Sequence, residues 1–279
     1  MIKACVIGHP IKHSRSPLIH GYWLESFDIK GNYTREDIGP EHLPDFFQRL
    51  RSGEFAGCNV TLPHKESSCA LVDHTDERVR RTGSLNTIYV RNGQLHATST
   101  DGEGFIANVV WRVPNFQFHG ANIVLIGAGG SAKALVDEML QVGAEKIFIA
   151  NRTLAKAQSI AATYGAAVTA IDLNEVSTVL AASTLLINTT SAGIANSGTL
   201  NIDFQRLQPS TVVADINYVP LITPFLIQAK AAGLQIVPGL GMLLHQAVRG
   251  FEFWFGQRPV VTQQLYDIVA RDIDPRYRP

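Results

Sequence analysis

The chain has 279 residues, 46% of them hydrophobic, and its 24 basic and 24 acidic side chains give a formal net charge of zero. This length allows one or two domains with substantial cores, and the balanced charge argues against nucleic acid or an anionic membrane as a partner. The three cysteines lack metal-ligand spacing, and neither a signal-peptide pattern nor an apolar run of membrane-spanning length is found. We therefore expect a cytoplasmic protein with reduced cysteines, no resident metal and no membrane segment.

Strands and helices alternate through the first hundred residues. Asn92-Gly93 is the strongest short signal for a hairpin, so the sheet is predicted to mix parallel and antiparallel strands. Ser16 is a plausible N-cap of the first helix, with Pro17 in its first turn. The expected strands are 4–8, 32–38, 57–61, 86–91 and 94–100, and the expected helices are 17–27, one opening at 40, 63–72 and 75–82.

The second half alternates in the same way, which is typical of a doubly wound parallel sheet. Its expected strands are 123–126, 146–150, 166–171, 184–190, 211–217 and 235–237, and helices are expected after Asp101, after the first of these strands, before Gly165, after Asp172 and at Thr223-Pro224. Two apolar helices, 240–255 and 262–272, come last, and we expect them to cover the exposed sheet of the first domain. The prediction is an α/β protein with a mixed-sheet domain (1–103 and 240–279) and a Rossmann-like nucleotide domain (104–239).

A glycine-rich turn opens the nucleotide domain. The apolar strand 123–126 runs into Gly127-Ala128-Gly129-Gly130-Ser131-Ala132, and a helical pattern follows at once. In a dinucleotide site the first glycine permits the tight turn, the second lets the backbone approach the pyrophosphate, and a small residue allows close packing of helix on strand. The helix start then offers free N–H groups and a positive dipole end to the phosphates. The segment 123–153 is therefore predicted to be a βαβ dinucleotide unit.

The end of the second strand of this unit indicates which dinucleotide binds. An NAD site usually has an acidic residue there, which accepts hydrogen bonds from the ribose 2′-OH. This chain has Asn151, Arg152 and Thr153, with Lys156 one turn later. A guanidinium and neutral donors suit a 2′-phosphate, so the predicted cofactor is NADP(H). The alternative is a solvated arginine at a helix start.

The first domain has polar residues at strand ends and turns, which are the positions that would line a substrate cleft. Each has a plain structural alternative: a helix cap for Ser16 or Asp101, a turn for Asn86, and a solvated surface position for Lys65. Together they suit a small, hydroxylated, neutral-to-acidic ligand. The candidates are Ser14, Ser16, Thr61, Lys65, Asn86 and Asp101.

A nicotinamide and such a ligand imply interconversion of a carbonyl and an alcohol. Hydride addition to a carbonyl carbon creates an alkoxide that needs a proton. An ammonium supplies both positive charge and the proton, and a nearby carboxylate positions it. Lys65 and Asp101 can take these roles if the fold brings them together.

These segments together resemble the shikimate dehydrogenase family, whose members reduce 3-dehydroshikimate to shikimate with NADPH. The resemblance runs nearly end to end, and so many motifs in order make it specific. The matching segments are Gly8-His9-Pro10-Ile11, His13-Ser14-Arg15-Ser16-Pro17, 59–65, Leu85-Asn86-Thr87, Thr100-Asp101-Gly102, 127–134, Asn151-Arg152-Thr153, 188–193, 215–220 and 239–247.

The resemblance implies a role for each candidate residue. Lys65 and Asp101 would be the catalytic pair. Ser14 and Ser16 would hold the substrate carboxylate, with Tyr218 close by. The ring hydroxyls would be bound by Thr61, Asn86 and Gln246, the last brought to the site by the returning C-terminal helices. The cofactor would be held by residues 127–132, Asn151, Arg152, Thr153, Lys156, Thr189, Thr190, Ser191, Ile216, Gly239 and Met242.

Two departures from the family pattern and two alternative functions are open at this point. His20-Gly21 stands where the family commonly has His-Asn, and Asn217 stands where an apolar residue is usual. Neither changes the proposed catalytic pair. The alternatives to a shikimate dehydrogenase are a relative that also oxidises quinate, and a catalytically silent sensor of a nucleotide or metabolite. We expect a monomer or homodimer acting on a small molecule.

Overall fold

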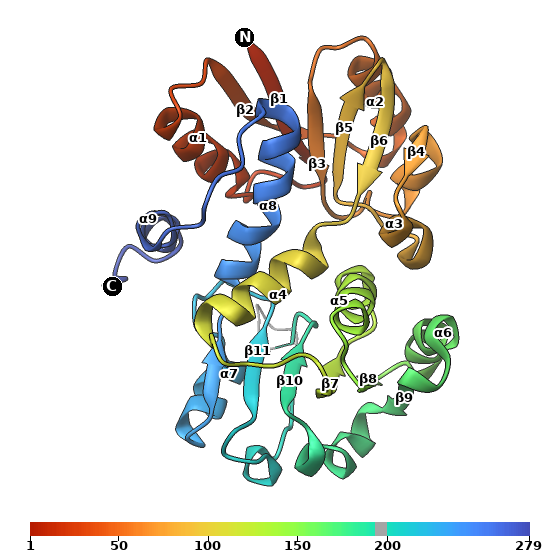
Figure 1. Cartoon of the computed structure of the whole chain (residues 1–279), viewed down its shortest axis with the longest axis vertical. Coiled ribbons are helices and arrows are strands. Elements are labelled where there is room, and N and C mark those ends of the chain that lie inside the picture. The colour runs from red at the N-terminus through yellow and green to blue at the C-terminus, as the bar shows by residue number, and fades with distance from the viewer. Residues whose placement is uncertain (193–199) are drawn as a thin grey trace. The chain divides into compact units, whose positions relative to one another are not determined.

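The computed structural model describes residues 1–192 and 200–279, and Gly193, which ends one of the motifs above, lies outside them. The chain forms two compact units (Figure 1). The first unit comprises Met1–Asp101, Leu244–Val269 and Arg278–Pro279, and the second comprises Gly102–Leu243 and Ala270–Tyr277. Within the described ranges, no helix combines the length and apolar character needed to cross a bilayer.

The first unit is built on a mixed sheet with the strand order β2-β1-β3-β5-β6-β4. Its strands are β1 (Ile2–Gly8), β2 (Gly31–Asp37), β3 (Gly57–Val60), β4 (His74–Thr75), β5 (Thr87–Arg91) and β6 (Gln94–Thr98). β1 is parallel to β2 and β3, whereas β5 is antiparallel to β3 and β6, so the predicted mixture is confirmed. Asn92 and Gly93 have φ values of 53° and 73°, the left-handed conformation that a tight hairpin turn requires.

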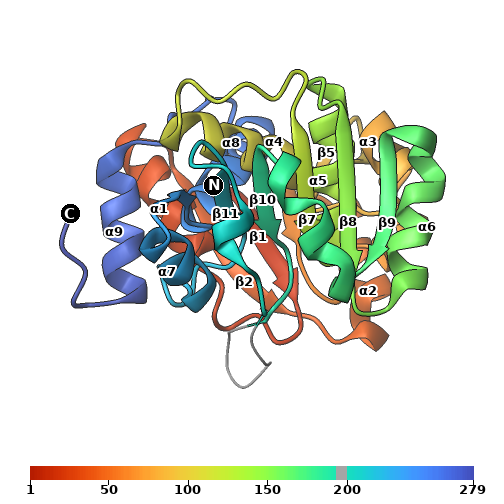
Figure 2. The ribbon, with the colours of Figure 1, turned by 90° about the horizontal axis from the view of Figure 1, so that it is seen from below.

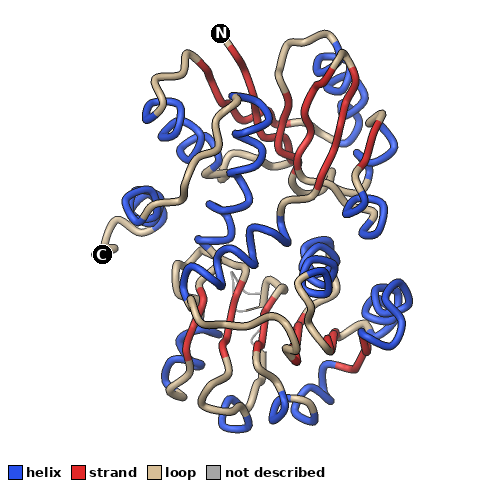
Figure 3. The backbone as a smooth tube through the Cα atoms, in the orientation of Figure 1, coloured by secondary structure: helices blue, strands red, loops and turns tan. Residues whose placement is uncertain are grey.

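Helices lie on both faces of this sheet, as Figure 3 shows. They are α1 (Ser16–Ser26), α2 (Leu43–Arg51), α3 (Glu77–Thr82) and the greater part of α8 (Leu240–Phe255), and α9 (Gln263–Ile273) begins in this unit. The Trp254 indole of α8 donates to the Ile88 carbonyl of β5 at 2.9 Å. A Cβ atom at Gly57 would lie 2.2 Å from that indole nitrogen, so only glycine permits this close packing. Of the two C-terminal helices expected to cover this sheet, α8 packs on it as expected, whereas α9 belongs to the first unit only as far as Val269.

His20 lies in an aromatic layer between α1 and the sheet. Its ring is fully buried and stacks on Tyr33 of β2, with 4.0 Å between centroids, while Phe251 of α8 lies 5.9 Å away. Burial lowers the pKa of His20 to about 3, because the charged imidazolium would lose its hydration. The side chain is therefore neutral in the folded protein at neutral pH.

This burial predicts an acid-sensitive contribution to stability. A histidine in the unfolded chain has a pKa of about 6.5. Between this pH and about pH 3, the unfolded state therefore binds a proton at His20 that the folded state does not bind. Stability is then full above pH 6.5 and falls as the pH drops toward 3, by about 2 kcal/mol between pH 7 and pH 5. In urea unfolding at both pH values, His20→Phe should remove this part of the pH dependence. The exposed His13→Gln variant should keep it, and equal pH dependence in wild type and His20→Phe would contradict the assignment.

The second unit is built on a parallel sheet with the order β12-β11-β10-β7-β8-β9. Its strands are β7 (Asn122–Ile126), β8 (Lys146–Asn151), β9 (Val168–Asp172), β10 (Leu185–Asn188), β11 (Val212–Asp215) and β12 (Gln235–Val237). Figure 2 shows β11, β10, β7, β8 and β9 side by side. Each pair of neighbouring strands in this order is parallel. This is the strand order of the dinucleotide-binding Rossmann fold, so the predicted doubly wound architecture is confirmed.

Alternate residues of these strands enter two separate cores. Ile123 and Leu125 of β7 pack into one core together with α5 (Gly130–Gln141), whereas Val124 and Ile126 pack into the other together with α7 (Pro224–Ala231). A parallel sheet covered by helices on both faces requires this double burial. The helices of this unit include α4 (Asp101–Arg112, whose first residue belongs to the first unit), α5 (Gly130–Gln141), α6 (Leu154–Tyr164) and α7 (Pro224–Ala231).

Several local predictions were wrong. The helix expected over 75–82 begins only at Glu77, because Thr75 belongs to β4, which pairs with β6. The segment 63–72 is helical only over the 3-10 turn Ser67–Leu71, and the segment after Asp172 forms 3-10 turns rather than an α-helix. Its β-branched residues, Val176 and Thr178 among them, are poor α-helix formers. Ser16 does not cap α1, because it is the first residue of that helix and the cap position falls on Arg15.

Candidate active site

The structure brings Lys65 and Asp101 together in the first unit. The Lys65 Nζ atom donates to Asp101 Oδ2, and the two side chains are only 15% and 10% exposed. Lys65 lies in the turn after β3, where its backbone carbonyl accepts from the Leu85 N–H. Asp101 is the first residue of α4, directly after the sheet. Lys65 is therefore not a solvated surface lysine, and the Asp101 carboxylate pairs with it.

The side-chain amide of Asn86 holds the other oxygen of this carboxylate. Its Nδ2 donates to Asp101 Oδ1 at 2.8 Å, and its Oδ1 accepts from the backbone N–H of Thr100 at 2.8 Å. Asn86 is only 3% exposed. Each oxygen of the Asp101 carboxylate therefore accepts a hydrogen bond, Oδ2 from Lys65 and Oδ1 from Asn86.

Gln246 joins the same cluster from α8. Its Oε1 lies 3.4 Å from Asn86 Nδ2 and 3.5 Å from the Thr100 hydroxyl. Gln246 is only 8% exposed. It contacts Asn86 although 160 residues separate the two in the sequence. The cluster thus combines an ammonium, a carboxylate and two amides in one buried location.

Ser14 and Ser16 lie next to each other at the start of α1. The Ser14 hydroxyl donates to Ser16 Oγ at 3.2 Å and accepts from the Ser16 N–H at 3.3 Å. Arg35 of β2 donates to the Ser14 carbonyl through Nε at 2.8 Å and Nη2 at 2.6 Å. This bidentate contact fixes the serine turn against the sheet. Sequence reasoning did not identify Arg35, because the contact depends on the β1–β2 pairing.

Two further candidates for substrate binding are placed separately. Thr61 is half-buried just after β3, and its N–H donates to the Ile7 carbonyl at 2.9 Å. Tyr218 is half-buried after β11 and belongs to the second unit.

In the second unit, the glycine-rich turn has the predicted backbone. Gly127 has a φ of 112°, and a Cβ atom there would lie 2.5 Å from Thr189 Oγ1. Gly129 is the N-cap of α5, and a Cβ atom there would meet nothing within 4 Å, so a ligand can approach this backbone. Ala132 is fully buried against the strands, while Gly130 and Ser131 form the first turn of α5 with Ala128 just before it. These features fit a pyrophosphate at a helix N-terminus.

The residues predicted to select the 2′-phosphate follow β8. Asn151 is its last residue, half-buried, and its Nδ2 donates to the Thr153 carbonyl at 2.8 Å. Arg152 and Thr153 are exposed in the turn before α6, and Lys156 is exposed in the first turn of that helix. The arrangement places cationic groups beside neutral donors, which fits a 2′-phosphate. It lacks the carboxylate with which an NAD site accepts hydrogen bonds from the ribose 2′-OH.

The remaining cofactor candidates follow the carboxyl ends of neighbouring parallel strands, where such folds bind ligands. Buried Asn188 organises this edge, because its Oδ1 accepts from the N–H of Thr190 at 2.9 Å and its Nδ2 donates to Asp215 at 3.0 Å. Burial raises the pKa of Asp215, against the effect of its hydrogen-bond donors. A Cβ atom at Gly239 would lie 2.4 Å from the Ile216 carbonyl. The candidates at this edge are Thr189, Thr190, Ser191, Ile216, Gly239 and Met242.

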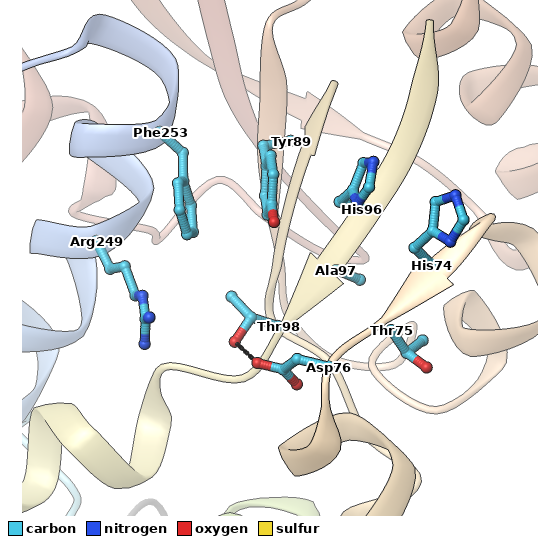
Figure 4. Close-up of a pocket in the computed structure, with 9 residues that line it drawn as sticks. All are labelled: His74, Thr75, Asp76, Tyr89, His96, Ala97, Thr98, Arg249 and Phe253. Carbon is cyan, nitrogen blue, oxygen red and sulfur yellow. Dashed lines mark hydrogen bonds between the residues drawn. The ribbon is translucent and has the colours of Figure 1, made fainter. Parts of the chain in front are cut away.

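A separate hollow of about 310 Å³ lies in the first unit between α8 and the β4–β6–β5 edge (Figure 4). A column of stacked rings forms its wall, with Phe253 on Tyr89 at 4.1 Å and Tyr89 on His96 at 5.3 Å. The Thr98 hydroxyl points to Asp76, to which it donates at 2.5 Å. The predicted site residues are not among its lining residues. Across the described parts of the chain, no group of three or more His, Cys, Asp and Glu side chains could hold a metal ion.

Sequence reasoning missed the residues that support the cluster. Asn59, Thr87 and Thr100 lie inside the motifs, yet they received no role. Asn59 and Thr87 are opposite each other on β3 and β5, and the Thr87 hydroxyl donates to Asn86 Oδ1 at 3.0 Å. Only the pairing of these strands shows that the side chains meet.

Comparison with known proteins identifies the family. Three family models match the chain. The model of the shikimate dehydrogenase substrate binding domain matches residues 6–88, that of shikimate / quinate 5-dehydrogenase matches 112–223, and that of the shikimate 5'-dehydrogenase C-terminal domain matches 239–261. The chain is 45% identical over 273 residues to the shikimate dehydrogenase (NADP(+)) of Rhizobium meliloti, which covers 97% of this chain and 95% of that protein.

Solved structures agree. The shikimate 5-dehydrogenase of Thermus thermophilus, in complex with NADP(H) and shikimate, has a TM-score of 0.85 and 31% identity, covering 98% of this chain and all of that one, 100%. The quinate dehydrogenase of Corynebacterium glutamicum, in complex with NAD, has a TM-score of 0.87 and 27% identity, covering 96% and 98% of the two chains. This chain therefore belongs to the shikimate dehydrogenase family, in agreement with its motifs, its Rossmann strand order and the pairing of Lys65 with Asp101.

Proposed function

We propose that this chain is an NADP-dependent shikimate dehydrogenase, which reversibly reduces 3-dehydroshikimate to shikimate with NADPH in the shikimate pathway. The observation that carries the proposal is the buried ion pair of Lys65 and Asp101, with the Asn86 and Gln246 amides beside it. A pure sensor has no need for a proton-transfer pair of this kind. The two shikimate dehydrogenases named above, which this chain matches over 95% and 100% of their length, support the same activity.

The proposed chemistry assigns the proton to Lys65. When bound, NADPH supplies the hydride that adds to the carbonyl carbon of the substrate. The carbonyl π electrons move to the oxygen, which takes a proton from the Lys65 ammonium as the new O–H bond forms. In the oxidative direction the neutral amine takes this proton back. Asp101 accepts from Nζ and so keeps the amine aimed at the reacting oxygen.

The same proposal assigns binding roles to the remaining residues. Ser14 and Ser16, with Tyr218, bind the substrate carboxylate, and ring hydroxyls are bound by Thr61, Asn86 and Gln246. The two serine hydroxyls lie next to each other, and Arg35 holds their turn through the Ser14 carbonyl, which supports the carboxylate assignment.

The cofactor is proposed to bind the second unit. Residues 127–132 hold the pyrophosphate, Asn151, Arg152, Thr153 and Lys156 hold the 2′-phosphate, and Gly239 and Met242 border the nicotinamide. Thr189, Thr190, Ser191 and Ile216 complete the proposed cofactor contacts. The open backbone at Gly129 and the exposed Arg152 support these roles. The boundaries 1–103 with 240–279 for substrate and 104–239 for cofactor are proposed on this basis.

A direct assay tests the proposal and its two alternatives. Shikimate or quinate is added with NADP and then with NAD, and the absorbance of the NADPH or NADH formed is followed. We expect shikimate with NADP to give the highest kcat/KM. A higher value for quinate with NAD would support a quinate dehydrogenase like the Corynebacterium protein, and no turnover of either polyol would support a sensor.

Two properties of the working enzyme are also proposed. We place it in the cytoplasm, where the thiols of Cys5, Cys58 and Cys69 would stay reduced. It acts as a monomer or a homodimer, and sedimentation measured with and without NADP distinguishes the two.

A further inference from the structure

A line of buried polar side chains leads through the sheet of the first unit to Asp101. Tyr33 of β2 is 5% exposed, Asn59 of β3 is 5% exposed, and Thr87 of β5 is fully buried. Asn59 and Thr87 are direct cross-strand partners. Burying a polar group costs free energy unless a hydrogen bond satisfies it. The hydrogen bonds among these side chains therefore determine how each of them is oriented.

These hydrogen bonds run in one direction. The Tyr33 hydroxyl donates to Asn59 Oδ1 at 2.6 Å, which leaves the Asn59 Nδ2 facing Thr87 Oγ1 at 3.2 Å. An amide N–H can only donate, so the Thr87 hydroxyl accepts from Asn59. Its own proton is then directed to Asn86 Oδ1, 3.0 Å away.

The orientation of the Asn86 amide is therefore determined by its neighbours. Its Oδ1 also accepts from the Thr100 backbone N–H at 2.8 Å, and a backbone N–H cannot accept. Its Nδ2 must then face Asp101 Oδ1, at 2.8 Å. The chain of donors ends on a carboxylate whose other oxygen accepts from Lys65. Aligned hydrogen bonds of this kind polarise and strengthen one another.

We infer that Thr87 is a positioning residue of the reaction. Its hydroxyl orients the Asn86 amide, which stops the Asp101 carboxylate from turning and so keeps Oδ2 against Lys65. Asn59 and Tyr33 orient Thr87 in turn. The inference rests on the proposed function, because it takes Lys65 and Asp101 as the proton-transfer pair. Thr87 acts through Asn86 and not on the substrate, so its loss lowers kcat more than it raises KM.

Replacement of Thr87 tests this with a control from the opposite strand. Thr87→Val should lower kcat for shikimate oxidation about tenfold, as expected when a buried hydrogen bond is lost, and should change KM by less than about threefold. Thr87→Ser keeps the hydroxyl and should restore kcat to within about twofold of wild type. Thr98 is the cross-strand partner of Thr87, is also buried, and donates to Asp76 instead (Figure 4). Thr98→Val should therefore leave kcat within about twofold of wild type.

A double-mutant cycle separates the relay from a structural effect. In an Asn86→Ala background, Thr87→Val should cause no further loss of kcat, since the residue through which Thr87 acts is already gone. The inference would be overturned by an unchanged kcat in Thr87→Val, by equal loss in Thr87→Ser and Thr87→Val, or by additive losses in the double variant. Wild-type turnover of shikimate with NADP is measured alongside. Its absence would instead reject the proposed function.

Discussion

Replacing Lys65 with alanine should lower kcat for shikimate oxidation by about 100-fold or more, because a general acid–base group is removed from the reacting oxygen. The effect on KM should be smaller, since the Ser14, Ser16 and Gln246 contacts are proposed to hold the ground state. The pair that is broken is buried, and its Nζ donates to Asp101 Oδ2. Initial rates of NADPH formation at several shikimate concentrations give both constants.

A control is needed because Lys65→Ala leaves the Asp101 carboxylate buried without its cation, which costs stability. The melting temperature is therefore measured with each rate. Lys65→Met fills a similar volume and should lose kcat to the same extent as the alanine variant. Lys30→Ala removes an exposed lysine after α1 and should behave as wild type. An unchanged kcat in a folded Lys65→Ala enzyme would remove Lys65 from the mechanism.

Replacing Arg152 with alanine should raise the KM for NADP about tenfold or more, because a charge-assisted hydrogen bond to the 2′-phosphate is lost. The constants for NAD should stay nearly unchanged, since NAD carries no phosphate there. The preference for NADP over NAD, measured as the ratio of kcat/KM values at saturating shikimate, should therefore fall by the same factor.

The matched control removes another exposed arginine of the same unit. Arg206 lies in a 3-10 turn and pairs with Asp203 at 3.3 Å. Arg206→Ala should leave both cofactor constants unchanged. Comparable efficiency with NADP and NAD in the wild type, unaffected by Arg152→Ala, would reject the assignment of the phosphate site.

Features that depend on a few consecutive residues were predictable from the sequence. Gly127 adopts the positive φ expected of a tight phosphate-binding turn, and Asn92-Gly93 forms the expected hairpin. Thr223 caps α7 through the Leu226 N–H as expected. Such signals work because backbone sterics and caps act between near neighbours in the chain. The alternation of these elements was then enough to indicate the Rossmann-like fold.

The assembly of the site depended on residues far apart in the chain. Lys65 was one lysine among many until the fold placed it against Asp101, and family resemblance alone singled out Gln246, 160 residues from Asn86. Arg35 behind Ser14, and Thr87 behind Asn86, carried no local signal at all. The two-residue strand β4 also escaped, because it exists only through pairing with β6. Local propensity governs turns, caps and periodicity, whereas the direction of a buried hydrogen bond is decided by strand pairing and helix packing, which bring distant residues into contact.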